Sequence, residues 1–257
     1  MSSQSDHAHA FHALHQKGDP LVLYNIWDAG SAAAVAAAGA KAIATGSAPV
    51  AMAQGFVDGE NIPLDLVLDN LRRIIATVDL PVSSDLEGGY GAAPEMVAQS
   101  VTRTIEAGAV GFNFEDQIVG TAELYDVAAQ ITRIRAARKA ADDVCDSIYI
   151  NARTDIFLKA KPDAHTPQML DAAILRAKAF ADAGADGFFA PGLADSAMIE
   201  RLCKECTLPV NIIALPYVPA PKTLKGLGVG RISYGPVPYK KMATWLEGEA
   251  VKALNYA

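Results

Sequence analysis

The sequence predicts an α/β fold, a single (β/α)8 TIM barrel, and three observations predict it. Short apolar runs alternate with Ala- and Leu-rich helical segments along the chain, which is typical of parallel strands joined by helical crossovers. Eight such runs occur in 257 residues, as the barrel requires. No linker, low-complexity block or charge discontinuity divides the chain, so we expect one domain over residues 1–257. A doubly wound open sheet is the alternative.

Each expected strand has the length of a buried parallel strand and ends in small or acidic residues. The strands are expected at Leu21–Ile26, Ala42–Ser47, Pro81–Glu87, Gly111–Asp116, Ile148–Asp155, Gly187–Gly192, Pro209–Ala214 and Arg231–Gly235. The helices between them are expected at Ser31–Ala38, Leu64–Thr77, Pro94–Ala107, Val127–Ala141, Gln168–Ala183, Ser196–Cys206 and Pro221–Leu227. A leading helix in residues 1–18 and a helical tail in residues 236–257 complete the chain.

Glycine recurs where a helix ends just before a strand. The four cases are Ala38-Gly39-Ala40, Ala107-Gly108-Ala109, Ala183-Gly184-Ala185 and Leu227-Gly228-Val229. Glycine in this place is typical of a left-handed helix cap followed by a short turn. The repeat therefore supports successive strand-and-helix units.

Composition and charge exclude several classes of protein. Apolar residues make up 51% of the chain, which is ample for a core, and a net charge of -7 argues against a nucleic-acid partner. The basic cluster Arg133 to Lys139 is interpreted as one solvated helix face. No signal peptide or long apolar span is evident, so we expect a cytoplasmic protein without a membrane partner. Three cysteines fit a reducing compartment, and the spacing of Cys203 and Cys206 is interpreted as structural.

Acidic residues gather at the expected carboxyl ends of neighbouring strands, where a barrel builds its active site. Asp85 and Glu87 are two residues apart, as are Asn113 and Glu115. Because side chains alternate along a strand, each pair points the same way, and that direction can be the barrel mouth. With Asp58 from the loop after the second strand, three or four carboxylates converge.

Such a cluster needs protons or a cation to neutralise it, because neighbouring carboxylates disfavour mutual ionisation. A hard divalent ion such as Mg²⁺, with Mn²⁺ as a substitute, takes one or two direct carboxylates and several waters. This leaves positions for a bidentate substrate. The alternative is that these acids cap the following helices or pair with surface Lys and Arg.

A basic and an amide side chain are expected at the same mouth. Arg153 follows the fifth strand and can form a forked contact with a substrate carboxylate. The alternative for Arg153 is an internal ion pair with Glu115 or Asp85. Asn211, at the end of the seventh strand, can donate to a substrate oxygen.

An ordered set of motifs covers strands one to seven and carries a family resemblance. The motifs are Tyr24-Asn-Ile-Trp-Asp28-Ala-Gly-Ser31-Ala32, Ala44-Thr-Gly-Ser47, Gly55-Phe-Val-Asp58-Gly-Glu60, Asp85-Leu-Glu87-Gly-Gly-Tyr-Gly91, Asn113-Phe-Glu115-Asp116 and Asn151-Ala-Arg153-Thr-Asp155. Together they resemble the isocitrate lyase/phosphoenolpyruvate mutase superfamily. The resemblance implies Mg²⁺ held directly by Asp85 and through water by Asp58, Glu87 and Glu115.

The resemblance also implies a 2-oxo acid as the small-molecule partner. Its carboxylate would be held by backbone amides around Ser47 and Ala48 and by Arg153, with Trp27 counted among the substrate-binding residues. Asp58, Glu115 and Arg153 are the expected catalytic residues. The common chemistry of the family is a metal-stabilised enolate formed by breaking a C–C or P–C bond.

The segment after the fourth strand limits which of the family's reactions we expect. Isocitrate and methylisocitrate lyases carry a Lys-Lys/Arg-Cys-Gly-His loop there, whereas Gln117–Tyr125 contains neither Cys nor His. We therefore expect a lyase of a small 2-oxo acid, with oxaloacetate-like decarboxylation as the concrete case. A phosphonopyruvate or phosphoenolpyruvate mutase or hydrolase is the alternative enzyme, and a non-catalytic 2-oxo-acid binding protein is the alternative of another class.

The tail is expected to serve assembly. It begins with Pro236 and Pro238, continues as a helix over Met242–Leu254, and the prolines would stiffen a hinge. The resemblance implies that this helix is exchanged between barrels in a homodimer or homotetramer. The alternative is a terminal helix packed on its own barrel.

Overall fold

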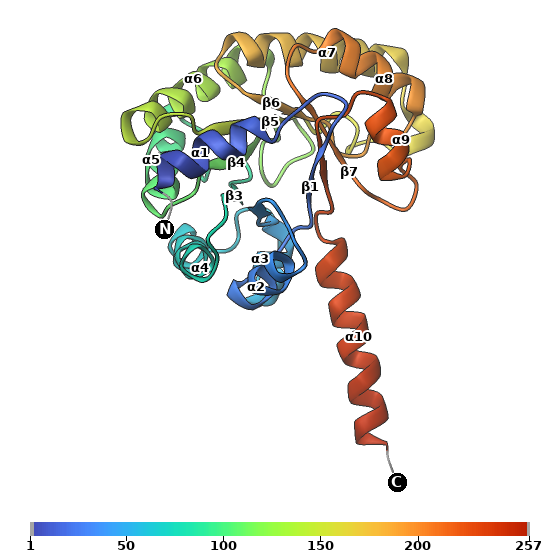
Figure 1. Ribbon diagram of the computed structural model, residues 1–257. Coiled ribbons are helices and arrows are strands. Elements are labelled where there is room, and N and C mark those ends of the chain that lie inside the picture. The colour runs from blue at the N-terminus through green and yellow to red at the C-terminus, as the bar shows by residue number, and fades with distance from the viewer. Residues whose placement is uncertain (1–2, 256–257) are drawn as a thin grey trace.

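Eight parallel strands form one sheet in the computed structural model, which describes residues 3–255 (Figure 1). The strand order is β1-β8-β7-β6-β5-β4-β3-β2, and the two end strands meet through a parallel bridge between Ile26 and Thr45. This bridge closes the sheet, so the structure confirms the (β/α)8 barrel and excludes the open sheet. The strands are β1 (Leu21–Leu23), β2 (Ile43–Ala44), β3 (Val82–Asp85), β4 (Gly111–Glu115), β5 (Tyr149–Arg153), β6 (Gly187–Phe189), β7 (Val210–Ile213) and β8 (Arg231–Ser233).

The helices surround the strands, as expected of helical crossovers. They are α1 (Gln4–Ala13), α2 (Ala29–Ala37), α3 (Ser47–Ala53), α4 (Leu64–Thr77), α5 (Pro94–Glu106), α6 (Val127–Val144), α7 (Pro167–Asp182), α8 (Ser196–Glu205), α9 (Pro221–Gly226) and α10 (Val237–Leu254), with a 3-10 turn η1 (Pro162–Ala164). The seven crossover helices predicted from the sequence are all present. The short helix α3 and the turn η1 were not predicted, and the strands are shorter than the apolar runs because their last residues bend into the mouth loops.

The glycine caps are confirmed. Gly39, Gly108, Gly184 and Gly228 have φ values of +90°, +105°, +104° and +90°. Each begins the turn from a helix into the next strand, where a left-handed residue satisfies the last helical carbonyls.

Helix α1 confirms the predicted leading helix and covers the amino-terminal end of the barrel. Phe11 is fully buried against the ring of Tyr149 at the start of β5, and His15 stacks on the same ring with a centroid distance of 3.9 Å. The Gln4 side chain donates to the carbonyls of Ile105 and Ala109. The floor of the barrel is therefore closed, and the opposite end, with the carboxyl ends of the strands, is left for the site.

The basic cluster on α6 is not one solvated face, so that prediction is wrong. Lys139 is exposed, but Arg133 is only 2% exposed, and Arg138 pairs with Asp186 at 3.1 Å. The helix turns Arg133 toward the barrel mouth, where two backbone carbonyls accept hydrogen bonds from its guanidinium. Periodicity alone could not show this, because the acceptors come from a distant loop.

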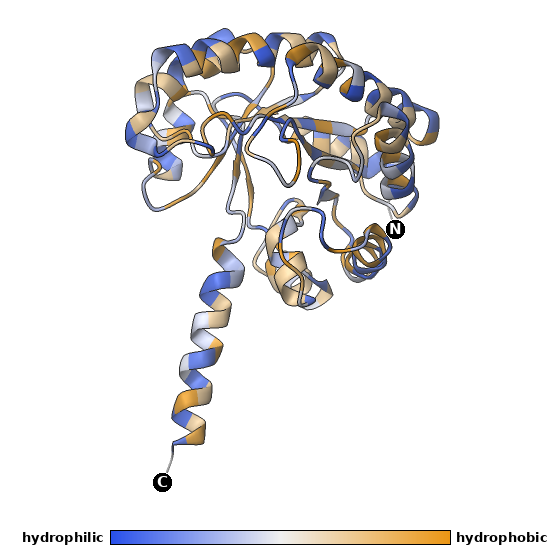
Figure 2. Cartoon of the chain, turned by 180° about the vertical axis from the view of Figure 1, so that it is seen from behind, coloured by the Kyte–Doolittle hydropathy of each residue, from blue (hydrophilic) through white to orange (hydrophobic). Residues whose placement is uncertain are grey.

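Helix α10 extends away from the barrel (Figure 1). It starts at Val237, so Pro236 is its cap and Pro238 lies in its first turn rather than in a separate hinge before Met242. Proline is favoured at this position because the first helical N–H groups have no partner within the helix. Apolar and polar residues are interleaved along it (Figure 2).

Across residues 3–255, no helix combines the length and apolar character needed to cross a membrane.

The cap glycines make a first prediction about stability. Gly39→Ala should lower the free energy of unfolding by about 1 kcal/mol, because the added Cβ meets no atom within 4 Å and the cost is backbone strain at φ +90°. Urea denaturation measures the change. Gly248→Ala is the matched control, since Gly248 lies within α10 without a positive φ or a close neighbour. It should be neutral or stabilising, and equal losses in both variants would contradict the cap.

Candidate active site

Asp85 lies at the carboxyl end of β3, at the centre of the acidic mouth. Its Oδ2 accepts a hydrogen bond of 3.1 Å from the amide of Ser47, the first residue of α3. Its own amide donates to Oγ1 of Thr45 at 2.9 Å. These contacts orient the carboxylate from the side of β2, while its Oδ1 is buried and has no hydrogen-bond partner.

Glu87 joins the loops after β2 and β3. It adopts a left-handed conformation with φ +51°, and its Oε2 accepts hydrogen bonds of 2.9 Å from the amides of Gly59 and Glu60. Asp58 immediately precedes these two amides and remains exposed at the rim. Glu87 therefore fixes the loop that carries Asp58.

Arg153 connects β5 with the acidic cluster. Its Nη1 lies 2.7 Å from Oε2 of Glu115, and its Nε and Nη2 donate to the two carboxylate oxygens of Asp155 at 2.6 and 2.8 Å. The internal ion pair considered for Arg153 thus exists with Glu115. The forked contact with Asp155 uses two of the five N–H groups of Arg153, and the contact with Glu115 uses a third. The remaining N–H groups can donate to a further acceptor.

The acids perturb one another. Burial, with Asp58 and Asp85 nearby, raises the pKa of Glu87 to about 8. Although Asp58 keeps exposed surface, partial burial of its carboxylate and the nearby charge of Asp85 raise its pKa. Burial also raises the pKa of Glu115, against the opposing charge of Arg153. The cluster therefore favours protonated acids in the absence of a cation, and a bound cation would stabilise their ionised form.

The donor set fits a hard divalent cation with one direct protein ligand. The unpartnered Oδ1 of Asp85 is a buried oxygen of the type Mg²⁺ prefers. Within residues 3–255, no three Asp, Glu, His or Cys side chains converge closely enough to form a complete ligand cage. The charge of Asp85 acts on three further carboxyl groups, those of Asp58, Glu87 and Glu115. This arrangement suits an ion that keeps several waters, which neighbouring carboxylates orient.

The remaining predicted substrate residues are placed differently. Ser47 and Ala48 form the first turn of α3 beside Asp85. Trp27 lies after β1, with its ring 5.2 Å from that of Tyr239 on α10. Asn211 is the second residue of β7, not its last, and is fully buried. Its amide donates to Ser233 at 3.2 Å and to two backbone carbonyls, so its donors are already used inside the barrel.

Two supporting residues were missed by sequence reasoning. The carboxylate of Asp155 accepts hydrogen bonds from Arg153, and the backbone amide of Asp155 donates to Oδ1 of Asp116. The other carboxylate oxygen of Asp116 accepts a hydrogen bond of 3.0 Å from Arg176 on α7. The spacing of Arg153 and Asp155 could have revealed the first contact, because side chains two apart on a strand share a face. Arg176 gave no such signal.

The loop after β4 covers the acidic loops. Val119 lies over Gly88 and Gly59, since a Cβ added at Gly88 would lie 2.8 Å from the Val119 side chain. Tyr125 closes the loop through its amide, which donates to the Asp116 carbonyl. An apolar side chain thus covers Gly88 in the segment that contains neither Cys nor His.

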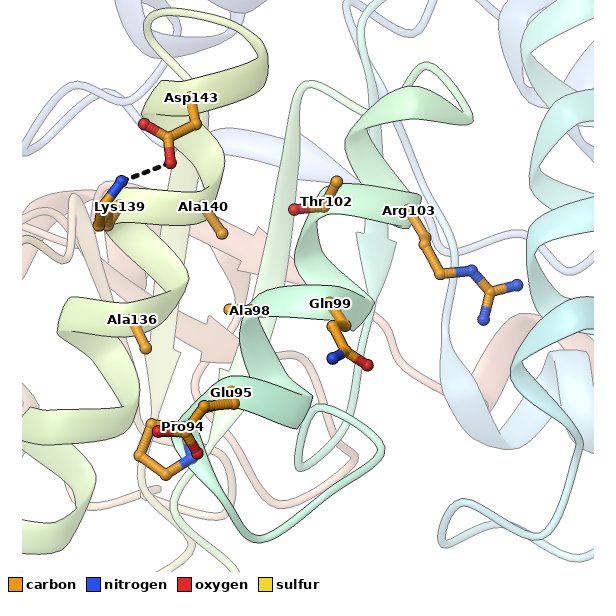
Figure 3. A pocket seen from close by; sticks show the side chains of 10 residues that line it. All are labelled: Pro94, Glu95, Ala98, Gln99, Thr102, Arg103, Ala136, Lys139, Ala140 and Asp143. Carbon is orange, nitrogen blue, oxygen red and sulfur yellow. Dashed lines mark hydrogen bonds and ion pairs between the residues drawn. The ribbon is translucent and has the colours of Figure 1, made fainter.

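Two other features lie away from the site. A groove of about 530 Å³ runs between α5 and α6 on the outside of the barrel, lined by small side chains such as Ala98 and Ala140 (Figure 3). Cys203 and Cys206 are buried free thiols, and burial raises the pKa of Cys203 to about 12. Neither feature contributes to the mouth.

Comparison with known proteins agrees with this geometry. Residues 11–254 match the model of the phosphoenolpyruvate phosphomutase family. A Burkholderia cenocepacia J2315 protein of provisional phosphonomutase assignment is 46% identical, with a TM-score of 0.94 over 98% of this chain and 100% of that one. The 2-methylisocitrate lyase of Escherichia coli K12 is 31% identical over 78% of this chain and 67% of its own. A phosphonopyruvate hydrolase solved with oxalate and Mg²⁺ shares the fold, with a TM-score of 0.83 and 19% identity over 100% of this chain and 89% of that one.

The fold and site therefore define a barrel enzyme of the lyase or mutase class. The chain belongs to the isocitrate lyase/phosphoenolpyruvate mutase superfamily.

The raised pKa of Glu87 predicts a pH-dependent stability. Between its ordinary pKa of 4.5 and about 8, the folded protein holds a proton that the unfolded chain has released. The melting temperature of the chelator-treated protein should therefore fall as pH rises through this window. Glu87→Gln should lessen the fall, and Mg²⁺ should oppose it. Glu106→Gln, at an exposed position of α5, is the control. A slope identical in all three proteins would contradict the burial of an uncompensated acid.

Proposed function

We propose that the protein is a Mg²⁺-dependent lyase that breaks a C–C bond in a small 2-oxo acid, with decarboxylation of an oxaloacetate-like acid as the concrete case. The observation that carries the proposal is the guanidinium of Arg153, fixed by Asp155 and Glu115, in the same mouth as the unpartnered oxygen of Asp85. Mn²⁺ has the same preference for oxygen ligands and can replace Mg²⁺.

The residues divide the work between binding and charge. Asp85 would hold the ion directly, with Asp58, Glu87 and Glu115 acting through water. When bound, the ion supplies positive charge that stabilises the negative charge developing on the 2-oxo acid as the bond breaks. Arg153 would hold the substrate carboxylate with its remaining donors, assisted by the amides of Ser47 and Ala48.

Two features of the chain support a C–C lyase of a small acid. Clamping by Asp155 and Glu115 means that Arg153 is oriented before substrate arrives, which reduces the cost of binding. The loop Gln117–Tyr125 presents Val119, not a thiol, over the site. Decarboxylation needs no thiol to protonate a leaving group, because carbon dioxide leaves as a neutral molecule and takes up no proton.

The proposed function predicts two Mg²⁺-dependent reactions. Purified protein should consume oxaloacetate and should exchange deuterium into the methyl group of pyruvate, followed by NMR. Arg153→Lys should lower kcat/KM by about 100-fold, which corresponds to about 2.7 kcal/mol, because an ammonium cannot make the forked contact. Arg72→Lys on α4, where Arg72 pairs with exposed Asp69, is the matched control.

The same assay separates the alternatives. Release of pyruvate and phosphate from phosphonopyruvate, without oxaloacetate turnover, would replace the proposal by a P–C hydrolase. Pyruvate binding with neither reaction above the Mg²⁺-only background would replace it by a binding protein.

We also propose that the enzyme works as a homodimer or homotetramer in which α10 packs on a neighbouring copy. Trp245 and Leu246 on α10 are 64% and 54% exposed. A groove of about 810 Å³ lies over β1 and α2 and includes Val22, which is 46% exposed. Because β1 pairs with β8, this is the surface that a helix following β8 would cover. A second copy's α10, about 27 Å long at 1.5 Å per residue, supplies the missing apolar cover.

Light scattering tests the assembly at micromolar concentration. The wild-type protein should have the mass of a dimer or tetramer, and Val22→Asp or Trp245→Asp should shift it toward the monomer because a charge would enter an apolar contact. Lys252→Ala, exposed near the end of α10, should not. A monomeric wild-type protein would contradict the exchange.

A further inference from the structure

The loop after β3 holds an unusual backbone that needs external support. Glu87 and Tyr90 are both left-handed non-glycine residues, with φ of +51° and +56°, and Gly89 between them has φ of +87°. A left-handed non-glycine residue is strained and persists only where its surroundings impose it. This loop also places Glu87 against the loop that carries Asp58.

Arg133 supplies that support from α6. Its Nη2 donates to the carbonyls of Gly88 and, at 3.0 Å, Gly91, so that one guanidinium nitrogen bridges the loop on both sides of the left-handed residues Gly89 and Tyr90. The side chain is 2% exposed. A buried guanidinium with carbonyl acceptors is a specific contact, because charge-assisted hydrogen bonds are the stronger ones.

The same side chain reaches the loop after β4. The guanidinium carbon lies 4.0 Å from the ring centroid of Tyr125 and 4.9 Å from that of Phe114. Its Nη1 donates to Gln130 at 2.7 Å, and Gln130 in turn donates to the carbonyl of Glu115 at 3.1 Å. Arg133 therefore touches the supports of both loops that border the acidic cluster.

We infer that Arg133 is a positioning residue for the metal site: it fixes the loop 86–91 in the conformation that holds Glu87 in place and ties this loop to Tyr125. Arg133 contacts neither Asp85 nor the side chain of Glu87, so its action is indirect. The inference rests on the proposed function only for the metal, since the conformation of the loop can be measured without one.

Hydrogen exchange tests the positioning itself. In the wild-type protein the amide of Gly89 donates to the Leu86 carbonyl and that of Tyr90 to Oε1 of Glu60 at 2.8 Å. In Arg133→Met, these two amides should exchange at least about 10-fold faster, while amides of β5 keep their wild-type rates. Arg135→Met, an exposed arginine on the same helix, is the control and should match wild type.

Mn²⁺ titration followed by electron paramagnetic resonance tests the consequence for the metal. Arg133→Met should bind Mn²⁺ about 10–100-fold more weakly than the Arg135→Met control, as outer-shell losses do. Arg133→Lys should be intermediate, because an ammonium can still donate to the loop carbonyls but cannot stack as a plane on the aromatic rings. Tyr125→Leu removes the aromatic platform alone and keeps the test available if Arg133→Met does not fold; it should weaken Mn²⁺ binding by less.

The outcomes separate the two claims. Unchanged exchange at Gly89 and Tyr90 in folded Arg133→Met, or in Tyr125→Leu if Arg133→Met does not fold, would overturn the positioning role. Mn²⁺ affinities of the same variants within about twofold of the control would also overturn it. A wild-type protein that fails to bind Mn²⁺ would instead overturn the metal site of the proposed function and the metal part of this inference. The exchange rates would then decide the positioning of the loop.

Discussion

The burial of several carboxylates at one edge is the constraint on which the mouth of this barrel depends. Parallel strands bring their carboxyl ends to one edge, so acids that are far apart in the sequence meet there whether or not they are neutralised. Glu87 and Glu115 are 4% and 6% exposed, and the pKa of each is raised by burial. A divalent cation would remove this penalty, which is why the site and the proposed metal belong together.

Three arginines from different elements hold the acidic loops in place. Arg153 on β5 pairs with Glu115 and Asp155, Arg176 on α7 with Asp116, and Arg133 on α6 binds carbonyls of the loop after β3. Each makes a different contact, so they are not interchangeable. All three lie on helices or strands, so rigid elements hold the acidic loops.

The sequence predicted what depends on periodicity and topology. Strand-and-helix alternation, left-handed Gly39 and Gly108, and the neighbouring positions of Asp85 and Glu115 all follow from local pattern and from the rule that strand ends meet. What it could not predict depends on contacts between distant segments. The burial of Arg133 requires carbonyls 42 and 45 residues away. The projection of α10 likewise depends on packing that no local pattern encodes.

The predictions for single residues also succeed where the strand fixes the side chain and fail where distant contacts decide. Arg153 was correctly placed at the mouth, because its strand fixes its direction, and its clamp by Asp155 was open to prediction from their spacing. Asn211 was expected at the end of its strand but is the second residue of β7, where the tilt and stagger of barrel strands put its amide among interior partners. Short polar residues inside a barrel strand are therefore weaker indicators of a site than acids in the loops that follow.

Asp85 and Arg153 should form one site in which a divalent cation and a 2-oxo acid bind together. Isothermal titration with oxalate, a stable dicarboxylate that can chelate a metal, tests this shared site. Oxalate should bind wild-type protein in Mg²⁺ but at least about 100-fold more weakly in chelator, a coupling of about 2.7 kcal/mol. Asp85→Asn should abolish this coupling. Equal oxalate affinity with and without Mg²⁺ would contradict a site shared by the ion and the acid.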